Sequence, residues 1–191
     1  MSNYTTNTAS KWSQVKLLIC DFDGVFTDDA VYVDQDGRES VRCLRADGYG
    51  ITLLQAAGVP VIVLSAEVNP VVAERCAKLG VSCDQGVTDK VAKLREICKW
   101  VPLSEVAYMG NDVNDLECLK AVGFPIVVRN AEKAVFRQIC GTDGPEFIAM
   151  DGWRSSHIVM GVHITQRSGG YGAVREVCDL ILDARREHGL G

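Results

Sequence analysis

Four aspartates follow an apolar run near the start of the chain, in the stretch LLICDFDGVFTDD. Asp21 and Asp23 come directly after the run and are two residues apart, so an extended backbone would present them on the same side. Carboxylates that crowd together repel one another and shift toward protonation unless a cation offsets their charge. The stretch therefore predicts a cation site where a buried strand meets a loop.

Further polar residues follow later apolar runs. Ser65 comes after VPVIVL, Lys90 opens the helical pattern KVAKLREICKW, and GNDVND supplies Asn111, Asp112 and Asp115. Hard oxygen donors without histidine or cysteine favour Mg²⁺. A cation, a hydroxyl and a lysine together suit phosphoryl transfer, because that chemistry depends on positioning and on neutralising the charge of the moving oxygens.

Each group then has an expected catalytic role. Asp21 could attack phosphorus in line and form an aspartyl-phosphate. Asp23 could protonate the leaving alcohol and then activate water. Ser65 would hydrogen-bond the phosphoryl oxygens, and Lys90 would balance their charge.

The expected Mg²⁺ ligands are Asp21, Asp23, Asn111 and Asp112, with Asp115 supporting them from behind. The residues leave open which of Asn111 and Asp112 touches the metal.

Plainer roles compete with these assignments. Ser65 alone would more often be a turn or cap residue. Lys90 could lie on the solvated face of its helix, with Asp89 as the helix cap. The glycines of GGYG (residues 169–172) could cradle a phosphate, but a flexible lead into the last helix is the simpler interpretation.

The elements that must position these residues alternate along the chain. Short β-branched runs and helical patterns follow one another from VKLLIC to AEKAVFRQIC, which predicts an α/β fold with a doubly wound parallel sheet flanked by helices. In such sheets ligands bind beyond the carboxyl ends of the strands. The polar residues above stand at those ends, so they should converge on one pocket.

Two segments interrupt the alternation. AVYVDQDGRESVRC predicts a β-hairpin flap over about residues 30–43, with its turn at Asp36-Gly37. Residues 141–164 mix turn residues with two short apolar runs, which suggests a second hairpin. We expect a disordered lead over residues 1–14 and a single domain over residues 15–191.

The net charge, the apolar stretches and the cysteines limit which kinds of partner the protein can bind. The 191 residues carry a net charge of -5 without Lys/Arg runs, which argues against nucleic acid or an anionic membrane as the main partner. We find neither an 18-residue apolar stretch nor an apolar core in the N-terminal segment that would mark a signal peptide. The eight cysteines form no CxxC pair, which fits a reducing cytoplasm and a small-molecule ligand.

The ordered set DFDGVFTD, Ser65 after VIVL, Lys90 and GNDVND resembles the four motifs of the haloacid dehalogenase superfamily of phosphatases. The segments VYVDQDGRESVRCLRADGYGI and GGYGAVREVCDL further resemble the branch that includes 3-deoxy-octulosonate 8-phosphate phosphatases and the phosphatase-like domains of CMP-sialic acid synthetases. Together these segments cover nearly everything from Val15 to Leu182. The resemblance implies that the chain has no large cap domain and that residues 141–164 are an atypical insertion. It also implies a homotetramer whose neighbouring subunits help close each active site, and a possible cytidylyltransferase in the same pathway.

The triplet Ser65-Ala66-Glu67 bears on the substrate. The octulosonate enzymes typically carry Thr-Gly-Arg there, whereas glutamate is similar to the sialic-acid-linked members. The resemblance thus implies a nonulosonate 9-phosphate, such as N-acetylneuraminate or KDN 9-phosphate, with 3-deoxy-octulosonate 8-phosphate as the alternative. The candidate substrate-binding residues are Glu67, Lys78, Arg45, Gly48 and Arg175.

Two departures from the family pattern keep other functions open. Asn111 stands where the family's metal-ligating aspartate is expected, and Tyr171 stands where the octulosonate enzymes tend to have arginine. A non-catalytic tetramerisation module associated with a CMP-sialic acid synthetase is therefore a second hypothesis. A phosphorylation-switch receiver domain, which also uses an acidic pocket on a doubly wound sheet, is the third.

Overall fold

The structure is a computed structural model that describes residues 11–144, 158–159 and 161–190. Within these residues, seven strands form one sheet in the order β5-β4-β1-β6-β7-β9-β8, and all neighbours pair in parallel except β8 and β9. The strands are β1 (Leu17–Cys20), β4 (Val61–Leu64), β5 (Ser82–Asp84), β6 (Val106–Gly110), β7 (Phe124–Val127), β8 (Ile158–Val159) and β9 (Val162–Ile164). The predicted doubly wound parallel sheet is confirmed.

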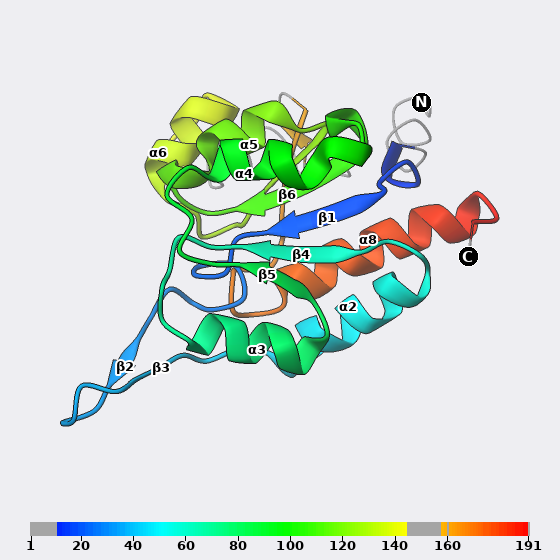
Figure 1. Cartoon of the computed structure of the whole chain (residues 1–191). Helices are drawn as coiled ribbons and strands as arrows, with labels where there is room; N and C mark the ends of the chain where they lie inside the picture. The colour runs from blue at the N-terminus through cyan, green and yellow to red at the C-terminus, as the bar shows by residue number, and fades with distance from the viewer. Residues whose placement is uncertain (1–10, 145–157, 160, 191) are drawn as a thin grey trace.

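Helices cover both faces of this sheet (Figure 1). One face carries α2 (Arg45–Ala56), α3 (Val71–Leu79) and α8 (Ala173–Glu187), and the other carries α4 (Lys90–Ile97), α5 (Leu116–Ala121) and α6 (Lys133–Val135). Within the part of the chain that the structure describes, no helix combines the length and the apolar character needed to cross a membrane.

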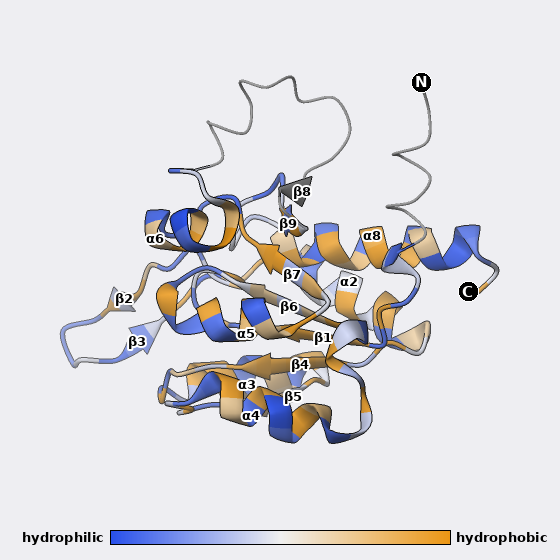
Figure 2. Cartoon of the chain, turned by 90° about the horizontal axis from the view of Figure 1, so that it is seen from above, coloured by the Kyte–Doolittle hydropathy of each residue, from blue (hydrophilic) through white to orange (hydrophobic). Residues whose placement is uncertain are grey.

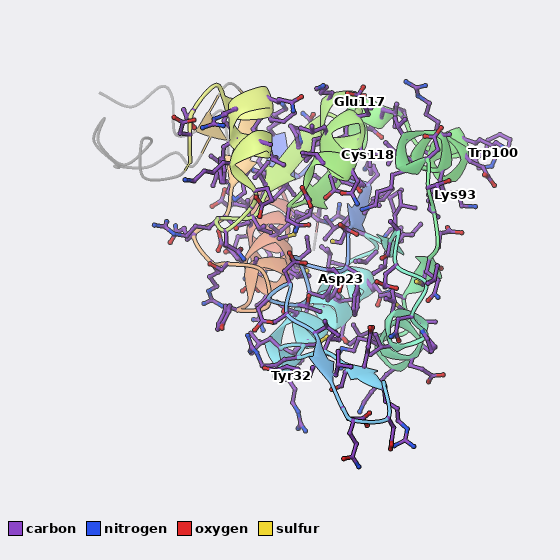
Figure 3. All side chains as sticks on the ribbon, turned by 90° about the vertical axis from the view of Figure 1, so that its left-hand side faces the viewer. Asp23, Tyr32, Lys93, Trp100, Glu117 and Cys118 are labelled. Carbon is purple, nitrogen blue, oxygen red and sulfur yellow. The ribbon has the colours of Figure 1, made fainter. Side chains whose placement is uncertain are left out.

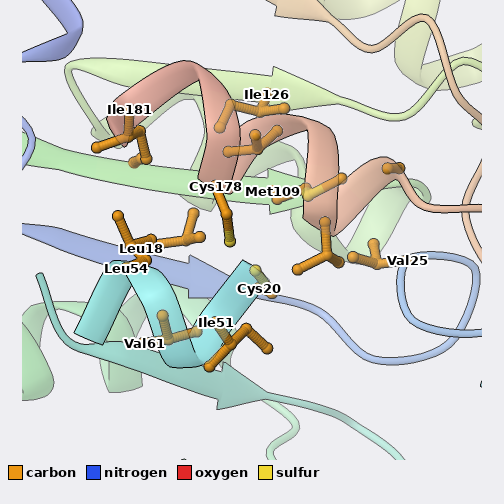
Figure 4. Packing of buried hydrophobic residues seen from close by; sticks show 14 of the residues in the cluster. Leu18, Cys20, Val25, Ile51, Leu54, Val61, Met109, Ile126, Cys178 and Ile181 are labelled. Atoms are coloured by element: carbon orange, nitrogen blue, oxygen red, sulfur yellow. The ribbon is translucent and has the colours of Figure 1, made fainter. Parts of the chain in front are cut away.

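The central strand β1 explains the two-sided core. Its four residues are all buried, with Leu18 and Cys20 in the cluster beside α2 and α8, and Leu17 and Ile19 in the cluster beside α4 and α5. Figure 4 shows Leu18 and Cys20 packed against residues of α2 and α8. A strand that is covered on both faces has a continuous run of apolar residues, and this run made β1 recognisable in the sequence. Figure 2 shows the apolar colouring of the sheet.

The predicted hairpin is present as β2 (Tyr32–Val33) and β3 (Glu39–Ser40), which pair antiparallel. Its turn is closed by the Asp34 carboxylate, which accepts hydrogen bonds from the backbone N–H groups of Asp36 and Arg38. Figure 1 shows the hairpin projecting from the side toward which the arrowheads of β1, β4 and β6 point. The hairpin therefore stands beside the carboxyl ends of these strands.

Two expected irregular segments contain ordered structure. Residues 11–14 of the expected lead instead belong to the folded body, because Trp12 is buried with its ring 5.3 Å from that of Phe124; residues 1–10 lie outside the described residues. In the expected insertion, residues 145–157 and 160 also lie outside them. The remaining part contributes the antiparallel pair β8–β9 at the sheet edge.

Candidate active site

The site forms where three adjacent strands end. Asp21 follows β1, Ser65 follows β4 and Asn111 follows β6, and the sheet places β1 between the other two strands. The backbone continues this pairing beyond the strands, because the N–H of Asp21 donates to the Met109 carbonyl at 2.9 Å. A cavity of about 310 Å³ opens here, lined by Asp21, Asp23, Asp29, Ser65, Ala66, Glu67, Val68, Asn111, Asp112 and Asn114.

Lys90 lies behind the cavity rather than on a solvated helix face. Lys90 is only 4% exposed, and its Nζ lies 2.9 Å from Asp21 Oδ2 and 2.8 Å from Asp115 Oδ1. Asp89 caps the helix by accepting from the Ala92 N–H, which sets Lys90 at the first helical position. Burial opposes the charge of Lys90, but the carboxylates of Asp21 and Asp115 outweigh it and raise the pKa of the ammonium.

The pKa of the Asp21 carboxyl is raised in this environment. Burial, followed by repulsion from Asp115, raises the pKa of Asp21 to about 7 against the attraction of Lys90. A cation beside Asp21 would favour its ionised form, and this form is the nucleophilic one.

Asp23 faces the same cavity and is partly exposed. Burial and the nearby carboxylates of Glu67 and Asp29 raise its pKa, while Lys90 and a hydrogen bond with the Thr27 hydroxyl act in the opposite direction. A carboxyl group with a raised pKa at a cavity wall is suited to exchange a proton with a bound molecule.

Asp115 lies behind the cavity and contacts both Lys90 and the loop after β6. Its side chain is fully buried, and Oδ1 accepts from Lys90 and from the Tyr108 hydroxyl at 2.7 Å. Its Oδ2 accepts from the backbone N–H groups of Asn111 at 2.9 Å and Asp112 at 3.3 Å. One carboxylate thus fixes both the lysine and the loop after β6.

The donor set of the cavity fits a hard cation. Its lining includes the carboxylates of Asp21, Asp23, Asp29, Glu67 and Asp112, and no Lys or Arg of the described ranges is part of it. A phosphate group would be repelled by such a wall unless a cation entered with it. In the described residues no three His, Cys, Asp or Glu side chains converge as a ready-made metal cluster.

Asn111 is better placed than Asp112 to supply a cation ligand from the loop after β6. Asn111 Oδ1 is buried without a hydrogen-bond partner, and the amide packs against Gly24 of the loop that carries Asp23. Asp112 instead accepts from the Val113 N–H at 2.6 Å and caps the short turn that follows. These contacts favour Asn111 as the ligand and give Asp112 a structural role.

Of the expected substrate-binding residues, Glu67 alone lines the cavity. Its Oε1 also accepts from the backbone N–H groups of Val68 and Asn69, at 2.6 and 2.8 Å. One of its two oxygens is therefore committed to the turn before α3.

The structure does not bring the other four candidates to the cavity. Lys78 is in the last turn of α3, and seven residues of helix separate it from Val71 at the end near Glu67, a rise of about 10 Å. Arg175 forms an ion pair with Asp179 at 2.8 Å, and Gly48 packs beside Leu79. Arg45 is the first residue of α2 and does not line the cavity. Their predicted contacts with a substrate are unsupported.

A second cavity of about 250 Å³ continues the first under the base of the hairpin. It shares Asp23, Asp29 and Glu67 with the first, and its other lining residues are Ala30, Val31, Glu39, Val41, Asn69 and Val71. Asn69 Nδ2 donates to Glu39 Oε2 at 2.8 Å and so connects α3 with the hairpin. This space suits the hydroxyl-bearing part of a phosphorylated molecule.

Four contributors to the site were missed in the sequence. Tyr108 looked like a core residue inside an apolar strand, and Asp29 and Thr27 were hidden in the first motif. Gly169, which we expected in a flexible lead, packs so tightly on the Gly24 carbonyl that a side chain would overlap it. The Asn130 side chain also accepts from the Gly169 N–H at 2.7 Å, so this glycine belongs to the wall behind the site.

The chain is similar over most of its length to known phosphatases, although no family model matches it. It is 30% identical over 179 residues to the 3-deoxy-D-manno-octulosonate 8-phosphate phosphatase KdsC of Salmonella typhimurium, covering 92% of this chain and 84% of that protein. A putative HAD family hydrolase from Streptomyces avermitilis is 36% identical, with a TM-score of 0.74 and coverage of 89% and 86%. A 3-deoxy-D-manno-octulosonate 8-phosphate phosphatase from Moraxella catarrhalis, solved with magnesium, phosphate and KDO, is 28% identical, with a TM-score of 0.78 and coverage of 97% and 96%.

Proposed function

The chain belongs to the haloacid dehalogenase superfamily of phosphatases, in the branch of the 3-deoxy-octulosonate 8-phosphate phosphatases, and on that premise we propose that it releases phosphate from a sugar-acid phosphate. The observation that carries the proposal is the buried Lys90 ammonium, 2.9 Å from Asp21 at a cavity that Asp23 and Ser65 also line. Mg²⁺ is typical of this family, and Asp21, Asp23 and Asn111 would hold it.

The reaction would proceed in two displacements. In the first, an oxygen of Asp21 attacks phosphorus, the bond from phosphorus to the sugar oxygen breaks, and Asp23 gives that oxygen a proton. In the second, Asp23 takes a proton from water, the water oxygen attacks phosphorus, and Asp21 leaves as a carboxylate with inorganic phosphate released. When bound, Mg²⁺ would supply positive charge that offsets the charge of the phosphoryl oxygens. Lys90 adds a second positive charge, and the Ser65 hydroxyl would donate a hydrogen bond to one of these oxygens.

The comparisons favour 3-deoxy-octulosonate 8-phosphate as the substrate, which was the alternative in the sequence analysis. Curated relatives carry that name, and the Moraxella catarrhalis enzyme was solved with KDO. Glu67 is the residue that favours a nine-carbon substrate, but one of its two carboxylate oxygens already accepts from the turn before α3. A nonulosonate 9-phosphate remains the second candidate, because Glu67 lines both cavities.

The test is kcat/KM with Mg²⁺ for 3-deoxy-octulosonate 8-phosphate, N-acetylneuraminate 9-phosphate and KDN 9-phosphate. We expect the eight-carbon substrate to be turned over fastest and Asp21→Asn to lower kcat by at least about 10³-fold, as loss of a nucleophile does. Asp183→Asn, an exposed aspartate of α8, serves as the matched control and should leave kcat unchanged. A nine-carbon preference would reverse the order of the two candidates, and no phosphate release from any substrate would contradict the proposal.

Assembly into a homotetramer is a further part of this proposal. Val31, Tyr32 and Val33 on the hairpin are 51%, 57% and 61% exposed, and exposed apolar and aromatic side chains gathered in one place mark interaction surfaces. A cytidylyltransferase of the same pathway is the partner that the resemblance suggests, and it is part of this proposal. The cytoplasmic location stays a prediction from the sequence.

A further inference from the structure

Tyr108, a buried residue of β6, is linked to the candidate nucleophile Asp21 through Asp115 and Lys90. Its side chain is fully buried in β6, and its hydroxyl donates to Asp115 Oδ1 at 2.7 Å. The same oxygen accepts from Lys90 Nζ at 2.8 Å, and Lys90 lies 2.9 Å from Asp21. Asp21, Lys90, Asp115 and Tyr108 therefore form one continuous chain of polar contacts that runs from the cavity into the interior.

Packing alone does not account for a phenol at this position. All five residues of β6 are buried, and Tyr108 lies in the apolar cluster that also contains Leu94, Leu116 and Leu119. A phenylalanine would fill the same volume, whereas a buried hydroxyl costs free energy unless it finds a partner. Burial, followed by the charge of Asp115, raises the pKa of Tyr108, so the phenol keeps its proton and stays a donor.

The shared oxygen of Asp115 determines how strongly Lys90 is held on that side. The three-way contact at Oδ1 divides the negative charge of this oxygen between two donors. Without the phenol, Lys90 would meet the whole charge of Oδ1 and be drawn toward Asp115. Its ammonium would then be less available to Asp21 and to a phosphoryl group bound beside it.

We propose that Tyr108 is a positioning residue for phosphoryl transfer, which acts by sharing Asp115 Oδ1 with Lys90 and so keeps the ammonium directed at the phosphoryl pocket. The inference deepens the proposed function and rests on it for the identity of the reaction. Binding of inorganic phosphate offers a readout that does not depend on turnover.

The experiment compares Tyr108→Phe with the unaltered enzyme in the presence of Mg²⁺. We expect kcat/KM for the best sugar-acid phosphate to fall about tenfold, in the range of one lost hydrogen bond to a charged group. The affinity for inorganic phosphate, measured by calorimetry with Mg²⁺, should fall by a similar factor, while the affinity for Mg²⁺ alone stays unchanged.

Thr165→Val is the matched control for losing a buried hydroxyl. Thr165 is fully buried, and its hydroxyl donates to the Arg167 carbonyl at 2.6 Å, outside the chain of contacts that includes Lys90. We expect this variant to lose thermal stability without losing phosphate affinity. The contrast separates a positioning effect from a general weakening of the interior.

A double-mutant cycle tests the route through the lysine. If Tyr108 acts by positioning Lys90, then Tyr108→Phe should have no further effect on phosphate affinity in a Lys90→Met background. Additive effects would overturn the proposal, as would a Tyr108→Phe enzyme with unaltered kinetics and phosphate affinity. A fall in Mg²⁺ affinity that matches the loss of activity would also overturn it, since the effect would then lie on the Asn111 loop.

These outcomes are distinguishable from failure of the proposed function. If the unaltered protein turns over no sugar-acid phosphate but Tyr108→Phe still weakens phosphate binding, the substrate assignment fails and the positioning role stands.

Discussion

Buried hydroxyls and amides hold the residues that face the cavity. Thr27 is fully buried, and its Oγ1 accepts from the backbone N–H groups of Gly24 at 3.1 Å and Asp29 at 3.2 Å. With both acceptor positions used, the hydroxyl hydrogen is left for Asp23. Burial raises the pKa of Asp23, and the hydrogen bond from Thr27 acts against this shift. The orientation of the proposed acid and base thus depends on a residue outside the cavity lining.

Replacing this hydroxyl should impair proton transfer. We expect Thr27→Val to lower kcat roughly ten- to a hundredfold, since a hydrogen bond to a charged group is worth about 1.5–3 kcal/mol. Thr27→Ser keeps the hydroxyl and should retain most of the activity in the same steady-state assay. Equal losses in the two variants would mean that the methyl group matters rather than the hydrogen bond.

The amide at position 111 should limit the affinity for metal. Asn111→Asp places a full negative charge at the unpartnered Oδ1 position, so we expect a several-fold higher affinity for Mg²⁺ by calorimetry. Asn114→Asp adds the same charge at an exposed part of the same cavity. An equal gain in both variants would indicate general electrostatic attraction and contradict coordination by residue 111.

At the scale of elements, the segment before α8 supports the first motif from behind. Gly169 and Gly170 pack on the loop that follows β1, and the Gly170 N–H donates to the Val25 carbonyl at 3.1 Å. A residue late in the chain thereby helps to shape a loop near its start.

A side chain at position 169 should push this loop out of place. We expect Gly169→Ala to lower the Tm and kcat together, because its Cβ would overlap the Gly24 carbonyl oxygen, which is backbone and cannot rotate away. Gly58→Ala is the control: it has open space but a φ of +82°, so it suffers backbone strain of about 1 kcal/mol without a clash. The prediction is wrong if both variants lose Tm equally and keep their kcat.

The contact between α2 and α8 carries a buried charge. Asp47 in α2 is fully buried, and its Oδ1 accepts from the Arg175 N–H at the start of α8 at 2.8 Å, while Oδ2 has no partner. Burial, opposed by the Arg175 hydrogen bond and by nearby arginines, raises the pKa of Asp47 from 3.8 to about 6. The native state therefore binds this proton more tightly than the unfolded chain does.

This shift should appear in the pH dependence of stability. As the pH rises from about 4 through 6, the free energy of unfolding should fall by about 3 kcal/mol at most, because the stabilising proton is lost. Asp47→Asn keeps an oxygen for the Arg175 N–H and cannot ionise, so its stability should not show this fall. Urea unfolding across this pH range measures both proteins, and identical pH profiles would contradict the assignment.

At the scale of the whole molecule, exposed aromatic residues occupy separate places. Tyr32 lies on the projecting hairpin and Trp100, which is 92% exposed, lies at a distant edge of the body (Figure 3). Tyr171 is also exposed, with the Arg42 guanidinium 4.3 Å from its ring centre. The hairpin is the surface that we propose for assembly.

Charges on the hairpin should therefore break the oligomer. We expect the unaltered chain to scatter light as a tetramer, and the double variant Tyr32→Asp, Val33→Asp to form smaller species, since burying two carboxylates in an apolar interface is unfavourable. Trp100→Asp is the matched control and should stay tetrameric. A monomeric unaltered chain, or dissociation caused by Trp100→Asp instead, would refute this interface.

The sequence alone was sufficient for the fold class, the hairpin and the four clustered motifs. These features are local: an apolar run marks a buried strand, the strand's end marks the site, and Asp36-Gly37 marks the turn. The same reasoning brought Asp21, Asp23, Ser65 and Lys90 together, because the carboxyl ends of neighbouring parallel strands meet at one edge.

Other features depended on distances between segments that are far apart in the chain. The tertiary structure favoured Asn111 over Asp112, attached Gly169 to Gly24, and gave the hydroxyl of Tyr108 a partner in Asp115. It also showed that Lys78 lies in the last turn of α3, whereas Glu67 precedes the first turn of that helix. Residue types and spacing say which chemistry is available, but which atoms meet is decided by packing, since neighbouring turns and strands compete for the same buried donors and acceptors.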